Sequence, residues 1–322
     1  MNAPILELKH VTRTFAVRRG LLEGQALLRA VDDASLSLFA GESLGLVGES
    51  GCGKSTLGRM AVGLLSPSAG EVRLRGTPLH TAHGRRNRAD VVPGRLQMVF
   101  QDPFSSLNPR LPVGVSVGEP LAARGVSGPQ RREAVAEMLR LVGLSPEHGR
   151  RFPHEFSGGQ RQRIAVARAL ITRPDVVVCD EPVSALDASV QAQVLNLLRD
   201  VQERFGPAYL FISHDLAVVG FMCPRILVMY LGRLVEESPR EALFETPAHP
   251  YTQALLASMP VREPGKRVPP PVLSGELPSP LQPPSGCAFH PRCPRAMDIC
   301  RREAPPWSEL AEGRRVRCHL YR

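Results

Sequence analysis

A glycine-rich run from Gly48 to Ser55 constrains this chain more than any other feature. It fits the pattern G-x-x-x-x-G-K-[ST], follows the apolar run 43–47, and precedes a helical pattern. Glycines let several backbone N–H groups converge on one anion, and the start of a helix adds partial positive charge. A plain glycine-rich turn would leave the lysine, the serine and the preceding strand as coincidences. The run therefore predicts a phosphate-binding loop.

Two side chains of this loop have the chemistry that a nucleoside triphosphate needs. We expect Lys54 to hold the β- and γ-phosphates, and Ser55 to offer its hydroxyl to Mg²⁺, a hard cation that takes few protein ligands. The predicted ATP-binding residues of the loop are Gly48, Glu49, Ser50, Gly51, Cys52, Gly53, Lys54, Ser55 and Thr56.

A second apolar run, 176–179, ends in two adjacent carboxylates, Asp180 and Glu181. Open parallel sheets bind ligands at the carboxyl ends of their strands, and unpaired buried carboxylates are costly. We expect Asp180 to assist Mg²⁺, directly or through water, and Glu181 to orient or deprotonate the attacking water. The alternative for each is an acid that only caps a helix.

The stretch from Phe156 to Gln160 places a serine and two glycines at the start of a helical pattern, about a hundred residues after the first loop. Such a helix start can bind a second anion. Taken alone, it fits an ordinary capped helix equally well.

The body of the chain alternates short apolar runs with helical patterns, which is typical of α/β architecture. Residues 43–47, 176–179, 209–212 and 226–229 read as strands, and 54–65, 130–142, 160–171 and 189–204 read as helices. Residues 5–38 and 72–74 could add antiparallel strands. We predict an α/β P-loop NTPase core with a mixed, largely parallel sheet, an antiparallel β subdomain and an inserted helical subdomain at about 102–160.

The last 63 residues differ in composition, because they hold 13 of the 31 prolines and four of the seven cysteines. This predicts a boundary between an ATPase domain, 1–259, and a small Cys/Pro-rich extension, 260–322. Stable disulfides are unusual in a reducing cytosol, so a metal is the better explanation for the four thiols. Paired zinc spacings are absent, whereas a 4Fe-4S cluster tolerates wider spacings. The candidate ligands are Cys287, Cys293, Cys300 and Cys318.

The net charge of +9 would suit nucleic acid, nucleotides or anionic lipid. The basic residues are scattered and aromatic residues are only 5%, which argues against a single-strand nucleic-acid surface. No stretch approaches the roughly 18 apolar residues of a membrane span, and the first four residues carry no signal region. We expect a cytosolic chain, or one attached to a membrane by partners.

With these motifs in order, the chain resembles the nucleotide-binding subunit of ATP-binding cassette (ABC) transporters. Gln101, after an apolar run, is similar to the family's Q-loop glutamine, and His214 falls at its switch histidine. Phe156 stands where leucine is commoner in the family's signature. The segment similar to the D-loop is Ser184, Ala185, Leu186 and Asp187.

The resemblance implies an ATPase that converts ATP and water to ADP and phosphate, with Glu181 and His214 as catalytic residues. It implies that Phe15 stacks on adenine, although a core phenylalanine is the alternative. Two subunits pair head to tail in the family, so that the signature of one acts on the ATP of the other. The implied magnesium ligands are Ser55, Gln101 and Asp180, and the implied signature residues are Ser157, Gly158, Gly159 and Gln160.

Residues 249–256 and 273–280 resemble the carboxyl extension of dipeptide and oligopeptide importers, and 101–110 resembles their F-type ATPase. This implies pairing with a related D-type ATPase or a second copy, two membrane permease subunits, an extracytoplasmic solute-binding protein, and a peripheral position at the cytoplasmic face of the cell membrane. Import of nickel complexes or glutathione stays open as an alternative. Some of these importers carry a 4Fe-4S cluster in the extension, which favours iron and sulfur over zinc or free thiols.

A soluble ABC ATPase acting on nucleic acid or ribosomes is the rival class. One phosphate loop and no sustained heptads argue against it, so we expect no nucleic-acid partner.

Overall fold

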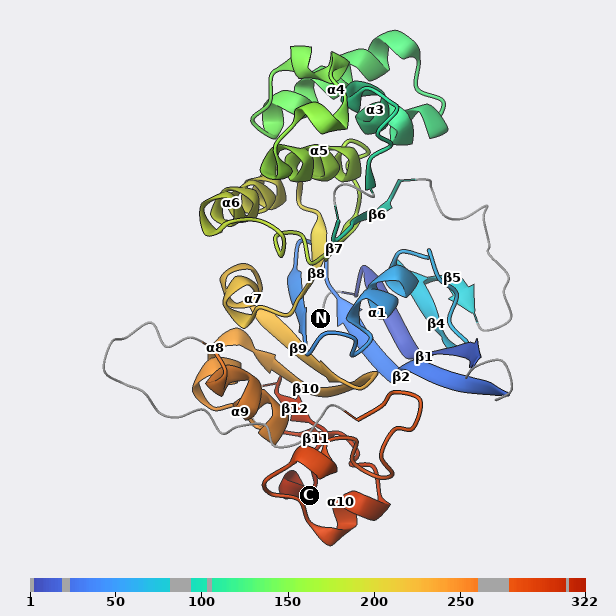
Figure 1. The fold of residues 1–322 in the computed structure, drawn as a ribbon, viewed down its shortest axis with the longest axis vertical. Coiled ribbons are helices and arrows are strands. Elements are labelled where there is room, and N and C mark those ends of the chain that lie inside the picture. The colour runs from blue at the N-terminus through green and yellow to red at the C-terminus, as the bar shows by residue number, and fades with distance from the viewer. Residues whose placement is uncertain (1–2, 19–23, 82–93, 103–105, 260–277, 311–312) are drawn as a thin grey trace.

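The computed structural model describes residues 3–18, 24–81, 94–102, 106–259, 278–310 and 313–322 (Figure 1). They form a four-stranded antiparallel sheet and an eight-stranded mixed sheet. Helices α3, α4 and α5 gather at one end of the long axis, and the carboxyl-terminal residues lie at the other (Figure 1). No helix in this part of the chain combines the length and apolarity needed to span a bilayer.

The strands are β1 (Leu6–Arg18), β2 (Gln25–Leu38), β3 (Ser43–Val47), β4 (Ala69–Leu74), β5 (Thr77–Thr81), β6 (Leu96–Val99), β7 (Val176–Asp180), β8 (Ala208–Ser213), β9 (Arg225–Tyr230), β10 (Arg233–Pro239), β11 (Ser308–Glu309) and β12 (Arg315–Val316). The α-helices are α1 (Lys54–Ala61), α3 (Val113–Ala123), α4 (Gly128–Leu141), α5 (Gly158–Leu170), α6 (Ala188–Phe205), α7 (Leu216–Met222), α8 (Arg240–Glu245), α9 (Pro250–Ala257) and α10 (Asp298–Arg302). Short 3₁₀ turns are η1 (Pro146–Arg150), η2 (Pro153–Glu155), η3 (His290–Arg292) and η5 (His319–Tyr321).

The large sheet has the strand order β11-β12-β10-β9-β3-β8-β7-β6, and the strands from β9 to β6 run parallel. Every residue of β3, β7 and β8 is buried, as expected where helices or a second sheet cover both faces. Alternate residues enter two different cores: Cys179 and Phe211 pack toward α5 and α6, whereas Val178 and Ile212 pack toward α1 and the antiparallel sheet. The mixed, largely parallel sheet is therefore confirmed.

The antiparallel sheet has the order β2-β1-β4-β5. The expected antiparallel strands within 5–38 and 72–74 are confirmed, and β5 is a strand that sequence reasoning did not predict. Buried leucines such as Leu6, Leu8 and Leu38 turn one face of this sheet toward α1 and the large sheet.

Between β6 and β7 the described residues form helices and 3₁₀ turns, without a strand. The predicted helices 130–142, 160–171 and 189–204 correspond to α4, α5 and α6 to within two residues at each end. The predicted helix 54–65 is too long, because α1 ends at Ala61 and Gly63 turns the chain with φ 74°. The segment between β6 and β7 places α5 beside α6, and not beside α1, the helix that follows the phosphate loop.

The carboxyl-terminal residues attach to the edge of the large sheet, where β12 pairs antiparallel with β10. They form few regular elements, and we call residues 278–310 and 313–322 the C-terminal extension. The predicted boundary after residue 259 falls where the described residues stop. Residues 273–277 of the importer-like motif lie outside the described residues. The position of that boundary stays a prediction.

Candidate functional site

The phosphate loop connects β3 to α1, and its glycines are required by close packing. A Cβ at Gly48 would lie 2.2 Å from the carbonyl oxygen of Met229, and one at Gly53 would lie 2.1 Å from that of Ala30. Gly53 also has φ 108°, a conformation that L side chains rarely adopt. The loop can therefore hold its N–H groups around an anion only with glycine at these positions.

Lys54 is buried in the curve of this loop. Its Nζ donates to the carbonyl oxygens of Gly48 at 2.7 Å and of Glu49 at 3.0 Å. The ammonium group is thus placed at the centre of the loop, where the phosphates of a nucleotide would replace these carbonyls as its partners.

Ser55, in the first turn of α1, contacts Asp180, the last residue of β7. The Ser55 hydroxyl donates to Oδ1 of Asp180 at 2.9 Å. Burial raises the pKa of Asp180, while the hydrogen bond from Ser55 and the charge of Arg59 oppose that rise. A hydroxyl and a carboxylate side by side are hard oxygen donors, so the pair fits Mg²⁺.

Glu181 lies next to this pair and is held from two sides. Gln101 Nε2 donates to Oε2 of Glu181 at 2.9 Å, and Nδ1 of His214 lies 3.2 Å from Oε1. Glu181 is a non-glycine residue with φ 47°, and its N–H donates to the carbonyl of Ile212 at 2.9 Å. Backbone strain of this kind is held in place by surrounding contacts and is concentrated at functional sites.

The structure therefore brings five predicted residues together: Ser55, Gln101, Asp180, Glu181 and His214. Gln101, Asp180, Glu181 and His214 lie at or just after the ends of β6, β7 and β8, which are side by side because these strands are parallel and in register. Ser55 comes from the first turn of α1. We call this group, with the phosphate loop, the phosphate edge.

The signature segment lies outside the phosphate edge, at the start of α5. Ser157 caps this helix: its Oγ accepts from the N–H of Gln160 at 3.3 Å, and Oε1 of Gln160 accepts from the N–H of Ser157 at 3.1 Å. Ser157 and Gly158 are exposed. This geometry fits an ordinary capped helix, and it leaves the start of α5 at the surface. A second anion site at this helix start stays a prediction. Phe156 is buried in the core, which suits an apolar exchange.

The D-loop lies beside the signature. Asp187 caps α6 by accepting from the N–H of Val190 at 2.9 Å, and its pKa is lowered first by the hydrogen bond from Ser189. A Cβ at Gly159 would lie 2.4 Å from Cγ1 of Val190, so α5 and α6 approach closely at this glycine. Ser184 donates to the carbonyl of Glu181 at 3.1 Å. The D-loop residues Ser184, Ala185, Leu186 and Asp187 thus link the signature to the phosphate edge.

Phe15 is half-buried on β1, opposite Leu28 of β2. The guanidinium carbon of Arg13 lies 4.7 Å from its ring centroid. The ring is therefore a surface-accessible aromatic on the antiparallel sheet, and its contact with adenine stays a prediction.

The four cysteines of the C-terminal extension are free thiols. Burial, together with the neighbouring thiols of Cys300, Cys318 and Cys293, raises the pKa of Cys287 to about 11, so the four lie in one neighbourhood. Nevertheless, within the described ranges no three His, Cys, Asp or Glu side chains are arranged to hold a metal ion. The residues as placed do not fit a metal cluster, and the predicted 4Fe-4S site, with zinc as its alternative, finds no support.

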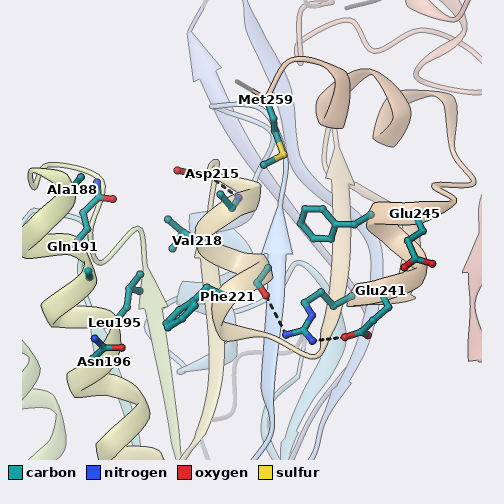
Figure 2. A pocket seen from close by; sticks show the side chains of 15 residues that line it. Ala188, Gln191, Leu195, Asn196, Asp215, Val218, Phe221, Glu241, Glu245 and Met259 are labelled. Atoms are coloured by element: carbon teal, nitrogen blue, oxygen red, sulfur yellow. Dashed lines mark hydrogen bonds and ion pairs between the residues drawn. The ribbon is translucent and has the colours of Figure 1, made fainter. Parts of the chain in front are cut away.

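A separate groove of about 760 Å³ lies between α6, α7 and α8 (Figure 2). Its walls include apolar side chains such as Leu195, Val218 and Phe221, and it reaches Ala188 and Asp215 near the D-loop and the switch histidine. None of its lining residues belongs to the phosphate loop. The groove is therefore distinct from the phosphate edge.

Sequence reasoning missed two residues that contact the phosphate loop. The hydroxyl of Tyr251 accepts from the N–H of Glu49 at 2.9 Å, and the guanidinium of Arg292 contacts the carboxylate of Glu49. Tyr251 stands in the importer-like motif, yet nothing in its spacing indicates the loop as its neighbour.

Comparison with known proteins agrees with this geometry. The family described as "ABC transporter" matches residues 31–184, and that described as "Oligopeptide/dipeptide transporter, C-terminal region" matches residues 235–300. A solved dimeric ATP-binding cassette bound to ADP and phosphate is 28% identical, with a TM-score of 0.64, over 73% of this chain and 98% of that one.

Curated relatives match almost the whole chain. A probable peptide ABC transporter ATP-binding protein of Sinorhizobium fredii is 51% identical, over 99% of this chain and 91% of the relative. The di/tripeptide transport ATP-binding protein of Pseudomonas aeruginosa is 50% identical over 98% and 97%, and the dipeptide transport ATP-binding protein of Escherichia coli is 46% identical over 99% and 95%.

The chain belongs to the ABC transporter family, as one of its ATP-hydrolysing subunits. Within that family it is an ATP-binding subunit of the peptide and dipeptide importers.

Proposed function

We propose that the phosphate edge hydrolyses ATP to ADP and phosphate, and that this reaction drives uptake of dipeptides or oligopeptides through separate membrane permeases. The arrangement of Glu181 carries the proposal. Its carboxylate is held by Gln101 and lies beside His214, next to the Ser55–Asp180 pair. This places a base, a hydrogen-bond donor and hard oxygen ligands at the end of the phosphate loop.

The loop binds the triphosphate through its backbone N–H groups and the ammonium of Lys54. Ser55, Gln101 and Asp180 would hold Mg²⁺, which supplies neutralisation of the charge on the β- and γ-phosphates. ATP and Mg²⁺ are the cofactors expected of an ABC ATPase.

Glu181 orients the attacking water and accepts its proton, because its two oxygens are fixed by neighbours rather than by solvent. The His214 side chain is 51% exposed, so its imidazole can turn from Glu181 toward the γ-phosphate. Gln101 is exposed and bridges this site to the helices that follow β6.

A second subunit completes the site in this proposal. Ser157, Gly158, Gly159 and Gln160 are presented at the start of α5, and the adjoining D-loop is exposed as well. The solved cassette that shares this fold is dimeric and holds ADP and phosphate. We infer head-to-tail pairing, with a related D-type ATPase or with a second copy, in which each signature contacts the partner's ATP.

The permease subunits would contact the region where the helices meet the large sheet. A groove of about 240 Å³ lies there between β6, α3 and α5, and includes Pro120, Ala165 and the 57% exposed Leu64. An apolar groove beside Gln101 is suited to transmit movement between a permease and the phosphate edge. The chain would then lie at the cytoplasmic face of the membrane, bound to two permeases, with an extracytoplasmic protein delivering the solute.

The transported solute follows from the relatives. Those described above are named for peptides, di/tripeptides or dipeptides, which favours peptides over nickel complexes or glutathione. The four tail thiols have no part in this mechanism.

Transport in reconstituted vesicles tests the proposal. Vesicles that contain the permeases, the partner ATPase and the solute-binding protein should take up labelled dipeptide only with ATP and Mg²⁺. Glu181→Gln should stop both uptake and phosphate release, whereas Glu203→Gln, an exposed glutamate of α6, should leave both unchanged. ATP-driven uptake of a nickel complex or glutathione without peptide uptake would contradict the peptide assignment, and phosphate release by Glu181→Gln at the wild-type rate would contradict the site.

A further inference from the structure

Three groups of Glu49, the second residue of the phosphate loop, make hydrogen bonds: its N–H, its carbonyl and its carboxylate. Its N–H donates to the hydroxyl of Tyr251 at 2.9 Å, and its carbonyl accepts from Lys54 at 3.0 Å. Its carboxylate accepts two hydrogen bonds from Arg292, with Nη1 2.8 Å from Oε2 and Nη2 3.0 Å from Oε1. The last contact joins the phosphate loop to the C-terminal extension across 243 positions of sequence.

Arg292 is fixed rigidly for this contact. It ends the 3₁₀ turn η3 and is only 7% exposed. The preceding Phe289 is fully buried, with its ring centroid 5.3 Å from that of Tyr230 and 5.4 Å from that of Tyr251. The guanidinium carbon of Arg292 lies 5.9 Å from the Tyr230 ring centroid, within cation–π range. The guanidinium therefore lies in a buried aromatic surrounding, in direct contact with the Tyr230 ring.

The pairing is a two-bond, charge-assisted contact, the strongest common geometry between an arginine and a carboxylate. Hydrogen bonding to Glu49 raises the pKa of Arg292, so the guanidinium stays charged at any ordinary pH. The carboxylate of Glu49 carries the same sign as a nucleotide's phosphates and belongs to the loop that receives them. Left without its partner, it would repel ATP and let the first turn of the loop move.

We propose that Arg292 is a positioning residue for ATP binding, which neutralises Glu49 and fixes the start of the phosphate loop. The C-terminal extension then supports ATP binding through Glu49, without contacting the phosphates itself. This inference rests on the proposed nucleotide site and adds to it a residue outside the family's nucleotide motifs.

The test measures the dissociation constant of Mg²⁺-ATP and the turnover of the full chain. Arg292→Ala should raise the dissociation constant at least tenfold, since it exposes the phosphates to an unpaired carboxylate. The double variant Arg292→Ala with Glu49→Gln should return to within threefold of the wild type, because the repelling charge is gone. Turnover at saturating ATP should change less than twofold in Arg292→Ala, since Ser55, Asp180 and Glu181 are untouched.

Arg315→Ala is the matched control, because Arg315 also anchors the extension but pairs with Glu237 of β10. It should keep the wild-type dissociation constant even if it lowers thermal stability. Arg292→Lys, which keeps the charge but loses the two-bond geometry, should fall between the wild type and Arg292→Ala, and it serves as the test variant if Arg292→Ala does not fold.

Three results would overturn the proposal: wild-type ATP affinity in a folded Arg292→Ala, a double variant as weak as Arg292→Ala alone, or an equal loss in Arg315→Ala. A wild-type chain that fails to bind ATP would instead refute the nucleotide site itself, and this inference with it.

Discussion

The phosphate edge and the C-terminal extension both attach to the large sheet, yet they are held by different means. At the phosphate edge, side chains meet because parallel strands end together, as in the contact of Gln101 after β6 with Glu181 after β7. The extension has few regular elements and is fixed by arginines that reach far across the sequence. The arginines and their partners are Arg292 with Glu49, Arg315 with Glu237, and Arg317 with Asp33.

This difference shows that backbone topology can position a site through short motifs, whereas an irregular segment depends on individual ion pairs. Glu237 is 8% exposed and accepts from both Arg225 and Arg315, so it joins β9, β10 and the extension. Trp307 adds to this contact, because the guanidinium carbons of Arg315 and Arg317 lie 4.5 and 5.0 Å from its ring centroid. Substitutions in the two regions should therefore fail in different ways.

The largest effect should come from the phosphate edge. Glu181→Gln removes the group that accepts the water's proton, so turnover should fall about 10²–10⁴-fold, the usual contribution of a general base. ATP binding should be retained, because Lys54 and the loop are unchanged. Phosphate release and equilibrium ATP binding should be measured on the same preparation. Loss of ATP binding together with phosphate release would contradict this prediction.

Lys54→Ala should weaken ATP binding, in contrast to Glu181→Gln, which should lower turnover only. Loss of a buried ammonium that faces the phosphates should weaken ATP binding about 100-fold, or about 2.8 kcal/mol at 1.4 kcal/mol per tenfold. Lys9→Ala is the control, because Lys9 pairs with Glu7 on the antiparallel sheet, away from the loop. Isothermal calorimetry should show wild-type affinity in the control and the weakened affinity in Lys54→Ala.

Where the C-terminal extension attaches to β10, Glu237→Gln should instead lower the free energy of unfolding. It leaves Arg315 without its charge partner, whereas Arg225 keeps Glu42. Loss of one partner costs about 3–5 kcal/mol for a fully buried pair, and we expect about 2 kcal/mol here, because Arg315 keeps some exposure. Glu241→Gln, in an exposed pair with Arg240, should leave the free energy of unfolding nearly unchanged. Urea unfolding measures the free energy of unfolding of both variants. Equal losses in Glu237→Gln and Glu241→Gln would show that burial of an ion pair does not decide its contribution.

The smallest effect should come from Phe15→Ala. Loss of one stacking contact with adenine should weaken ATP binding about fivefold, equivalent to about 1 kcal/mol. Phe39→Ala is a matched control, because its ring is likewise covered by an arginine, with the guanidinium carbon of Arg225 5.7 Å from the ring centroid. If both variants bind ATP as the wild type does, Phe15 is a structural phenylalanine.

Sequence patterns predicted the strands and helices that carry the phosphate edge, because each motif lies within a few residues of the strand or helix that positions it. The predicted strand 176–179 extends by one residue to Asp180, and α1 is four residues shorter than predicted. By contrast, nothing near Arg292 indicates Glu49 as its partner, since that contact depends on the path of the whole chain. The predicted metal cluster of the four cysteines finds no support, because their spacing could not determine whether the thiols point at a common centre.

Pairing of β12 with β10 has a consequence for truncated forms of this chain. Val316 and Arg315 occupy the outer side of β10, and the N–H of Arg317 donates to the carbonyl of Val235 at 2.8 Å. A chain that ends before these residues would present β10 with unpaired backbone groups, and a bare strand edge is a template for pairing with other chains. The last residues therefore protect the edge of β10 from pairing with other chains. Chains shortened before Arg315 should lose solubility before they lose ATP binding.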